Sequence, residues 1–158
     1  MDSKEIKIRE CIEKFGVYYK KTGHQPMVGR LMAYLMLAEP PQKTFEEIVE
    51  FLVSSKSAVS NTLNMLMYMG IVDYVKITGD RKRYFRLNQN AWNTMFEAQI
   101  QELSNLRGLV QEILNLRSDQ YPELNREISD FYSLLELYEQ EFPIMLNKWK
   151  QQIKSKNV

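Results

Sequence analysis

The segment of residues 54–70, SSKSAVSNTLNMLMYMG, limits most strongly what this chain can fold into. On a helix of about 100° per residue, its polar side chains fall within an arc of roughly 100°: Ser57, Ser60, Asn61, Asn64 and Tyr68. The rest of the circumference is apolar: Ala58, Val59, Leu63, Met65, Leu66, Met67 and Met69. This pattern predicts a helix that is buried on most sides and exposes a narrow polar stripe without an acidic residue.

Periodicity and helix breakers predict the elements on either side of this segment. Helices are expected over 3–21, 27–39 and 44–52, of which the third opens with a capping box formed by Thr44 and Glu47. Strands are expected over 71–77 and 83–87, joined by the turn residues 78–80. Two long helices should follow over 91–117 and 122–154, with Pro143 kinking or locally loosening the second.

This order of elements predicts a mainly α fold with a small β-hairpin wing, that is, a winged helix-turn-helix with long N- and C-terminal dimerisation helices. We expect three regions. Residues 1–26 would form an N-terminal dimerisation or support helix, residues 27–90 a winged helix-turn-helix DNA-binding domain, and residues 91–158 a C-terminal helical dimerisation region.

Positive charge is concentrated around the segment described first, although the whole chain carries a net charge of only +1. Residues 53–90 hold six basic and two acidic side chains, while residues 91–158 hold seven basic and ten acidic ones. Such segregation favours an anionic partner for one face. The alternative is a wing whose charges are simply solvated.

A helix with one bare polar face fits the major groove of DNA, where Asn61 and Asn64 can make paired hydrogen bonds to adenine. Ser55, Ser57 and Ser60 suit phosphates near the N-terminus of the helix, and the basic wing suits the minor groove or its phosphates. The predicted DNA-binding residues are Thr44, Ser55, Lys56, Ser57, Ser60, Asn61, Asn64, Lys76, Arg81, Lys82 and Arg83. The alternatives are an ordinary solvated face, or a winged-helix module that binds another protein without specific DNA binding.

The segments TFEEIVEFLVSSKSAVSNTLNMLMYMGIVDYV and ITGDRKRYF resemble MarR-like winged-helix regulators. GHQPMVGRLMAYLMLAEPPQ, GDRKRYF and Trp92 resemble the GbsR-type branch in particular, and the resemblance covers about residues 15–96. It implies a cytoplasmic, homodimeric transcriptional regulator, often a repressor, with residues 55–64 as recognition helix. It also implies that Asp80 and Arg81 form the wing pair that inserts Arg into the minor groove. This wing departs from the pattern, because residues 83 and 86 are basic where an acid is expected near one of them.

The long helices carry apolar stripes that predict a homodimer and hence a palindromic operator. The expected dimer-interface residues are Ile8, Cys11, Leu103, Leu106, Val110, Ile113, Phe131, Leu135, Tyr138 and Phe142. The alternative is an antiparallel hairpin within one chain that covers the domain, and both arrangements can hold together.

Aromatic residues of the first, second and fifth expected helices form a candidate effector pocket that could hold a quaternary ammonium group: Tyr18, Tyr19, Tyr34, Trp92 and Phe96. Aromatic core packing would need the same residues. Cys11 is expected to be a buried structural thiol, with redox sensing as the alternative.

Other classes of function find no support in the sequence. His24 has no cluster of ligands that would make a metal site, and no cofactor is expected. No catalytic arrangement is found, so an enzyme is not expected. The sequence contains no stretch for crossing a membrane, and we expect a cytoplasmic protein.

Overall fold

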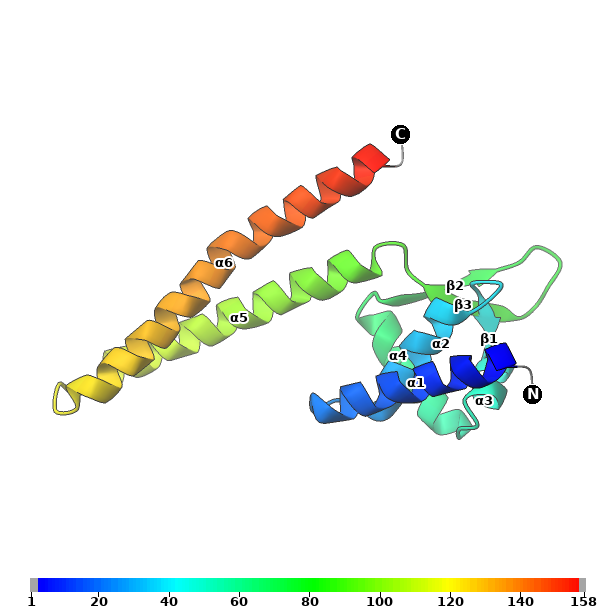
Figure 1. The fold of residues 1–158 in the computed structure, drawn as a ribbon, viewed down its shortest axis with the longest axis horizontal. Helices are drawn as coiled ribbons and strands as arrows, with labels where there is room; N and C mark the ends of the chain where they lie inside the picture. Colours follow the sequence, from blue (N-terminus) through cyan, green and yellow to red (C-terminus); the bar gives the residue numbers. More distant parts are fainter. Residues whose placement is uncertain (1–2, 157–158) are drawn as a thin grey trace. The chain divides into compact units, whose positions relative to one another are not determined.

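The computed structural model describes residues 3–156 and contains nine elements. They are α1 (Ser3–Lys21), α2 (Pro26–Leu37), β1 (Lys43–Thr44), α3 (Phe45–Phe51), α4 (Lys56–Tyr68), β2 (Val72–Lys76), β3 (Arg83–Leu87), α5 (Ala91–Leu116) and α6 (Pro122–Lys156) (Figure 1). The chain divides into two compact units, Met1–Met95 and Phe96–Val158. The division into three functional regions stays a prediction.

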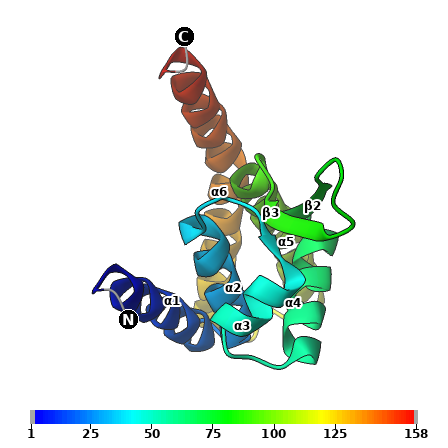
Figure 2. The ribbon, with the colours of Figure 1, turned by 90° about the vertical axis from the view of Figure 1, so that its right-hand side faces the viewer.

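The first unit is a winged helix-turn-helix, as the sequence predicts. Helices α2, α3 and α4 pack around an apolar core beside a three-stranded antiparallel sheet of order β1-β3-β2, and the β2–β3 hairpin extends beyond the helices (Figure 2). The largest fully buried side chains are Leu31, Ile48, Val59, Leu63, Leu66 and Ile71. Burial of each such side chain stabilises the fold by about 1.5–3 kcal/mol. This core holds α4 and the hairpin in place.

Helix α1 crosses α2 at very short range, and two glycines make this possible. A Cβ on Gly29 would lie 2.5 Å from the Phe15 carbonyl oxygen, and one on Gly16 would lie 2.9 Å from Cγ of Arg30. Arg30 then pairs with Glu13 of α1 at 2.7 Å. Because no side chain separates the two backbones at Gly29, α1 and α2 fit together tightly.

The turn of the helix-turn-helix contains a strained residue. Val53 has a φ of 46°, a left-handed conformation that disfavours β-branched side chains, and its side chain is 84% exposed. The turn is held by backbone hydrogen bonds from the amides of Val53 and Ser54 to the carbonyls of Glu50 and Val49. Burial of the side chain does not compensate for this strain.

In the second unit, α6 pairs with the part of α5 that follows Met95, in an antiparallel hairpin. Arg107 donates to Glu139 at 2.6 Å and to the Tyr132 hydroxyl at 2.8 Å, and Ser104 donates to Glu139 at 2.8 Å. Pro143 lies inside α6. Among the described residues, no helix is long and apolar enough to cross a membrane.

The element boundaries differ from the sequence expectation in a few places. Helix α2 ends at Leu37 rather than residue 39, because Ala38 is already extended ahead of the Pro40–Pro41 pair. Strand β1 was not predicted, and it pairs Lys43 and Thr44 with Phe85 and Tyr84 of β3. Helix α6 continues two residues beyond the expected end at residue 154.

Candidate nucleic-acid interface

Helix α4 is positioned by a cap at its start and by one buried side. The Ser55 hydroxyl accepts a hydrogen bond of 3.2 Å from the Ala58 amide, which satisfies one of the free N–H groups of the first turn. Val59, Leu63 and Leu66 are buried in the core. Thr62 is buried as well, and its hydroxyl donates to the Ala58 carbonyl at 2.9 Å.

The opposite side of α4 exposes the predicted polar stripe. Ser57, Asn61, Asn64 and Tyr68 are exposed, with Tyr68 at 93%, and Ser60 is partly exposed. Lys56 in the first turn is exposed too. Amide, hydroxyl and ammonium groups therefore face outward from one helix, and no acidic side chain lies between Val53 and Val72 to oppose an anion.

The apolar side of α4 is less buried than expected. Met65 is 39% exposed and Met69 is 45% exposed, so the expectation that both are buried is wrong. The core buries the side of α4 that carries Leu63 and Leu66. The side chains of Met65 and Met69 are only partly covered by it.

Thr44 does not present its side chain to a partner, contrary to its place in the predicted DNA-binding set. It is 5% exposed, and its hydroxyl lies 2.8 Å from a Glu47 oxygen and accepts from the Glu47 amide at 3.3 Å. The predicted capping box is therefore present. Because the box occupies the hydroxyl, Thr44 positions α3 and is not available to bind DNA.

The tip of the wing is braced by Asp80. Its carboxylate accepts hydrogen bonds from the Tyr84 hydroxyl at 2.6 Å and from the Lys82 amide at 2.9 Å, and these bonds hold the pKa of Asp80 below its ordinary value. The same bond to Asp80 raises the pKa of Tyr84. Asp80 thus bonds to the loop itself, while the side chains of Arg81 and Lys82 are exposed.

The basic residues of the hairpin have different environments. Arg86 pairs with Asp73 across the strands at 2.9 Å, and the guanidinium of Arg83 lies 5.1 Å from the centre of the Tyr74 ring. Arg83 also stands directly opposite Lys76 in the strand register. Like charges opposite each other on antiparallel strands are destabilising, and a bound anion would relieve this repulsion.

Asp73 supplies the acid that the wing sequence lacks near residues 83 and 86. Sequence reasoning missed this pair because the two residues are separated by twelve others along the chain. The signal that could have found it is the hairpin register itself, which places residue 73 opposite residue 86 once the turn at 78–80 is fixed.

The residues of the candidate effector pocket have separate environments. Tyr34 stacks on Phe51 at 4.6 Å, while Tyr19 packs edge-on against Tyr18 at 5.9 Å and donates to the Met32 sulfur at 3.3 Å. Trp92 is 40% exposed. Phe96 belongs to the second unit and contacts Phe142 there, at 5.8 Å between ring centres. The structure brings no aromatic cage together within the first unit.

The expected dimer residues divide into two groups. Val110 and Leu135 are 5% exposed in the single chain, so the α5–α6 hairpin already buries them. Leu106, Ile113 and Phe131 are 38%, 48% and 43% exposed. The others are partly buried: Ile8, Cys11, Leu103, Tyr138 and Phe142. The α5–α6 hairpin therefore leaves apolar side chains uncovered, and whether it covers the first unit stays a prediction.

Neither His24 nor Cys11 gains a group of ligands in the fold. Cys11 is a free, partly buried thiol, and the His24 ring lies 5.8 Å from that of Tyr19. Across residues 3–156, no group of three or more His, Cys, Asp or Glu side chains is placed to hold a metal ion.

Comparison with known proteins agrees with this architecture. The chain is 27% identical over 147 residues to the HTH-type transcriptional regulator MmpR5 of Mycobacterium tuberculosis, covering 93% of this chain and 89% of the relative. A crystal structure of a transcriptional regulator superposes with a TM-score of 0.76 at 27% identity, covering 92% of this chain and 99% of that one. No family model matches the sequence. The chain is therefore similar, over most of its length, to winged helix-turn-helix transcriptional regulators.

Proposed function

We propose that this regulator acts as a homodimer that binds a palindromic DNA operator, with α4 in the major groove and the wing on the flanking minor groove or its phosphates. The observation that carries the proposal is the exposed, acid-free stripe of α4 next in sequence to a basic hairpin. Repression of transcription is the proposed outcome of operator binding.

The stripe of α4 supports separate roles for amides and hydroxyls. Asn61 and Asn64 are exposed and can each make two hydrogen bonds to an adenine edge. Ser57 lies at the N-terminal end of the helix, where the helix dipole and free N–H groups favour a phosphate. We infer that the two amides determine which DNA sequence is bound. Ser57 would instead help to position α4 on the DNA backbone.

The wing supports an electrostatic role. Arg86 is neutralised by Asp73, whereas Arg81, Lys82 and Lys76 have no carboxylate within ion-pair distance among residues 3–156. The cations that remain uncompensated are thus gathered towards the tip of the hairpin. A tip of this kind suits phosphates or the narrow minor groove, both of which have a strongly negative potential.

Apolar side chains on the outside of the second unit support the dimer. Leu134, Leu137, Ile144 and Met145 of α6 are each more than half exposed, and they line an apolar groove of about 620 Å³. A monomer rarely leaves so much apolar surface in contact with water. Because α6 alone supplies this groove, we propose that a second copy of the chain covers it.

Three finer points belong to the same proposal. We propose from the sequence motifs that the protein belongs to the GbsR-type branch. We also propose that it is cytoplasmic and that it responds to a small-molecule effector. A winged-helix module that binds only protein is the competing function, and the uncompensated wing cations favour DNA over it.

Competition binding with one selected and one scrambled duplex tests the role of α4, after selection of bound DNA from a random pool. Asn64→Ala should weaken binding to the selected duplex by about tenfold or more, because a paired base contact is worth about 1–3 kcal/mol. Ser57→Ala is the matched control and should weaken both duplexes by a similar, smaller factor. Equal losses on both duplexes for Asn64→Ala would overturn the assignment of specificity to α4.

The salt dependence of binding tests the wing. Arg81→Ala should weaken binding to every duplex and flatten the slope of log affinity against log salt by about one unit for each lost contact in each subunit. An unchanged slope in a folded variant would contradict the electrostatic role.

Sedimentation of the full-length chain tests the dimer. Replacing Leu137 and Ile144 together by Glu should yield monomers, whereas Gln140→Glu adds a charge at an exposed polar position of the same helix and should not. A clean monomer of the unaltered chain at micromolar concentration would refute the dimer and with it the palindrome. Deletion of residues 124–158 should likewise leave monomeric or aggregating protein.

A further inference from the structure

The exposed face of α4 changes in chemistry along the helix. Its first half presents hydroxyl and amide groups, from Ser57 to Asn64, whereas its last turn presents large apolar side chains. Tyr68 is 93% exposed, Met69 is 45% exposed and Met65 is 39% exposed. These three residues are spaced i, i+3 and i+4, so they are neighbours on the surface of the helix. We call them the apolar end of α4.

The apolar end continues the polar stripe of α4. At about 100° per residue, Tyr68 falls within about 20° of both Ser57 and Asn61 around the helix axis, which is the middle of the stripe. Met65 follows Asn61 by about one turn, at the edge of the stripe, and Met69 is rotated by about 100° from Tyr68. A partner that lies along the stripe would therefore contact Tyr68 and Met65 and leave Met69 at its margin.

Packing within the first unit does not account for the exposure of these side chains. The core takes the opposite side of α4, where Val59, Leu63 and Leu66 are buried. Single exposed apolar residues are common on protein surfaces, but adjacent ones form a patch, and an exposed patch is typical of an interaction surface. The apolar end is therefore a candidate contact surface for a partner.

The charge around the apolar end favours DNA as this partner. No acidic side chain occurs between Val53 and Val72, and α4 contacts β2 of the basic hairpin (Figure 2). Asp73, the first acid beyond α4, pairs with Arg86 at 2.9 Å. Residues 53–76 thus leave no carboxylate uncompensated, which suits a partner that carries phosphates.

The major groove of DNA offers an apolar group to such a surface, the 5-methyl group of thymine. Asn61 and Tyr68 are seven residues apart, which corresponds to about 10 Å along the helix and to about three base steps of DNA. Within one stretch of the groove, the amides can hydrogen-bond to adenine while the apolar end reaches methyl groups. Different parts of the same helix would then read adenine edges and thymine edges.

We propose that Tyr68 and Met65 contact the 5-methyl groups of thymines in the operator. They thereby favour thymine about three base pairs away from the position that Asn61 contacts. The inference rests on the proposed function, because it requires α4 to lie in the major groove. It adds a source of sequence specificity that involves no hydrogen bond.

Uracil substitution in the DNA tests the inference, because uracil lacks the 5-methyl group of thymine and keeps its hydrogen-bonding groups. In the duplex selected from a random pool, each thymine is replaced in turn by uracil, and binding of the full-length protein is measured. At one or two positions in each half-site, uracil should weaken binding by about fourfold, the factor expected for one buried methyl group. Uracil at the remaining thymines should have no effect.

Variants of the protein then assign each methyl group to a side chain. Tyr68→Ala and Met65→Ala should each weaken binding to the thymine duplex by a similar factor. The uracil penalty at the contacted position should disappear in the variant that has already lost the contact. Circular dichroism should show both variants folded, because alanine is the better helix former. Met69→Ala is the matched control, since it removes a methionine of similar exposure and should keep the full uracil penalty.

The possible outcomes separate this inference from the proposed function. Sequence-specific binding that uracil leaves unchanged at every thymine would overturn the inference alone. A uracil penalty that persists in full in both variants, or that disappears only in Met69→Ala, would do the same. Unchanged DNA affinity of both variants would show that the apolar end binds something other than DNA. Equal binding to the selected and scrambled duplexes would refute the proposed function and the inference together.

Discussion

The Tyr84 hydroxyl donates a hydrogen bond of 2.6 Å to the Asp80 carboxylate and so links the start of strand β3 to the loop at the tip of the wing. The same carboxylate accepts from the Lys82 amide, which fixes the loop on the far side of Arg81. The acid of the Asp-Arg pair therefore acts on the loop backbone and on Tyr84. This arrangement leaves the Arg81 side chain exposed at the tip.

Removal of the Tyr84 hydroxyl should release this brace. Because that bond is the first cause of the lowered pKa of Asp80, Tyr84→Phe should raise the pKa of Asp80 toward its ordinary value. An NMR titration of the Asp80 carboxyl measures the change. Tyr74→Phe is the control, since Tyr74 contacts Arg83 and makes no bond to Asp80; an equal shift in that variant would contradict the assignment.

The sign of the pH dependence follows from the two directions. A lowered pKa of Asp80 contributes stability above its unfolded-state value, and this contribution is lost as the pH falls through the lowered folded value. A raised pKa of Tyr84 contributes stability below its unfolded-state value, and this contribution is lost as the pH rises through the raised folded value. The wing should be braced across the neutral range and loosen at both extremes.

Gly29→Ala should destabilise the first unit by about 1–3 kcal/mol, because its Cβ would lie 2.5 Å from the Phe15 carbonyl oxygen and 2.7 Å from Cδ2 of Tyr19. Urea denaturation followed by circular dichroism gives the free energy of unfolding. Gly108→Ala is the matched control within α5, where a Cβ would meet nothing within 4 Å. That variant should gain up to about 1 kcal/mol from helix propensity. A neutral Gly29→Ala would show that α1 and α2 can separate at little cost.

Val53→Gly should increase the free energy of unfolding by about 1 kcal/mol. The left-handed conformation at φ 46° costs a β-branched residue about 1–2 kcal/mol, and little burial is lost because the side chain is 84% exposed. Thermal denaturation measures the gain. Val53→Ala keeps a Cβ and should gain less; a larger gain for Ala than for Gly would exclude backbone strain as the cause.

Lys76→Gln should have opposite effects on stability and on binding. It removes the repulsion from Arg83 directly opposite, which should stabilise the free protein by about 0.2–1 kcal/mol at low salt. It also removes a wing cation and should weaken binding to every duplex. Unfolding and binding measured in the same buffer check both signs, and a loss of both stability and affinity would indicate a structural role for Lys76.

Much of the fold could be predicted because local patterns determine it. Helix α1, strand β3 and the start of α6 at Pro122 have the expected bounds, and the capping box of Thr44 and Glu47 is present. Strand β1 could not be predicted in the same way. It has two residues, no periodicity, and a partner some forty residues away in β3, so only the folded core brings the two together.

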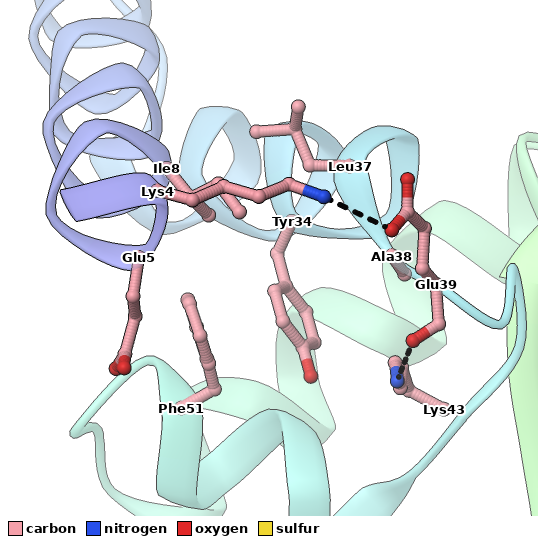
Figure 3. A pocket seen from close by; sticks show the side chains of 9 residues that line it. All are labelled: Lys4, Glu5, Ile8, Tyr34, Leu37, Ala38, Glu39, Lys43 and Phe51. Atoms are coloured by element: carbon pink, nitrogen blue, oxygen red, sulfur yellow. Dashed lines mark hydrogen bonds and ion pairs between the residues drawn. The ribbon is translucent and has the colours of Figure 1, made fainter. Parts of the chain in front are cut away.

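In the candidate site, too, the features set by local sequence could be predicted, and those set by contacts between elements could not. The exposure of Asn61 and Asn64 follows from helical periodicity, which is a local property. The pairing of Asp73 with Arg86 and the stacking of Tyr34 on Phe51 depend on which elements meet. For the same reason, the sequence grouped Tyr34 with Tyr18 and Tyr19, whereas the fold places it in a pocket with Lys43 and Phe51 (Figure 3).

The close crossing of α1 and α2 at Gly29 has a mechanical consequence. Since no side chain lies between the backbones there, neither helix has a soft layer that could absorb a displacement of the other. A push on α1 would move α2 with it, and α2 packs directly on α4. Because the crossing at Gly29 is stiff, a contact made by α1 far from α4 would be transmitted through α2. Such a contact would change the angle at which α4 meets the proposed DNA partner.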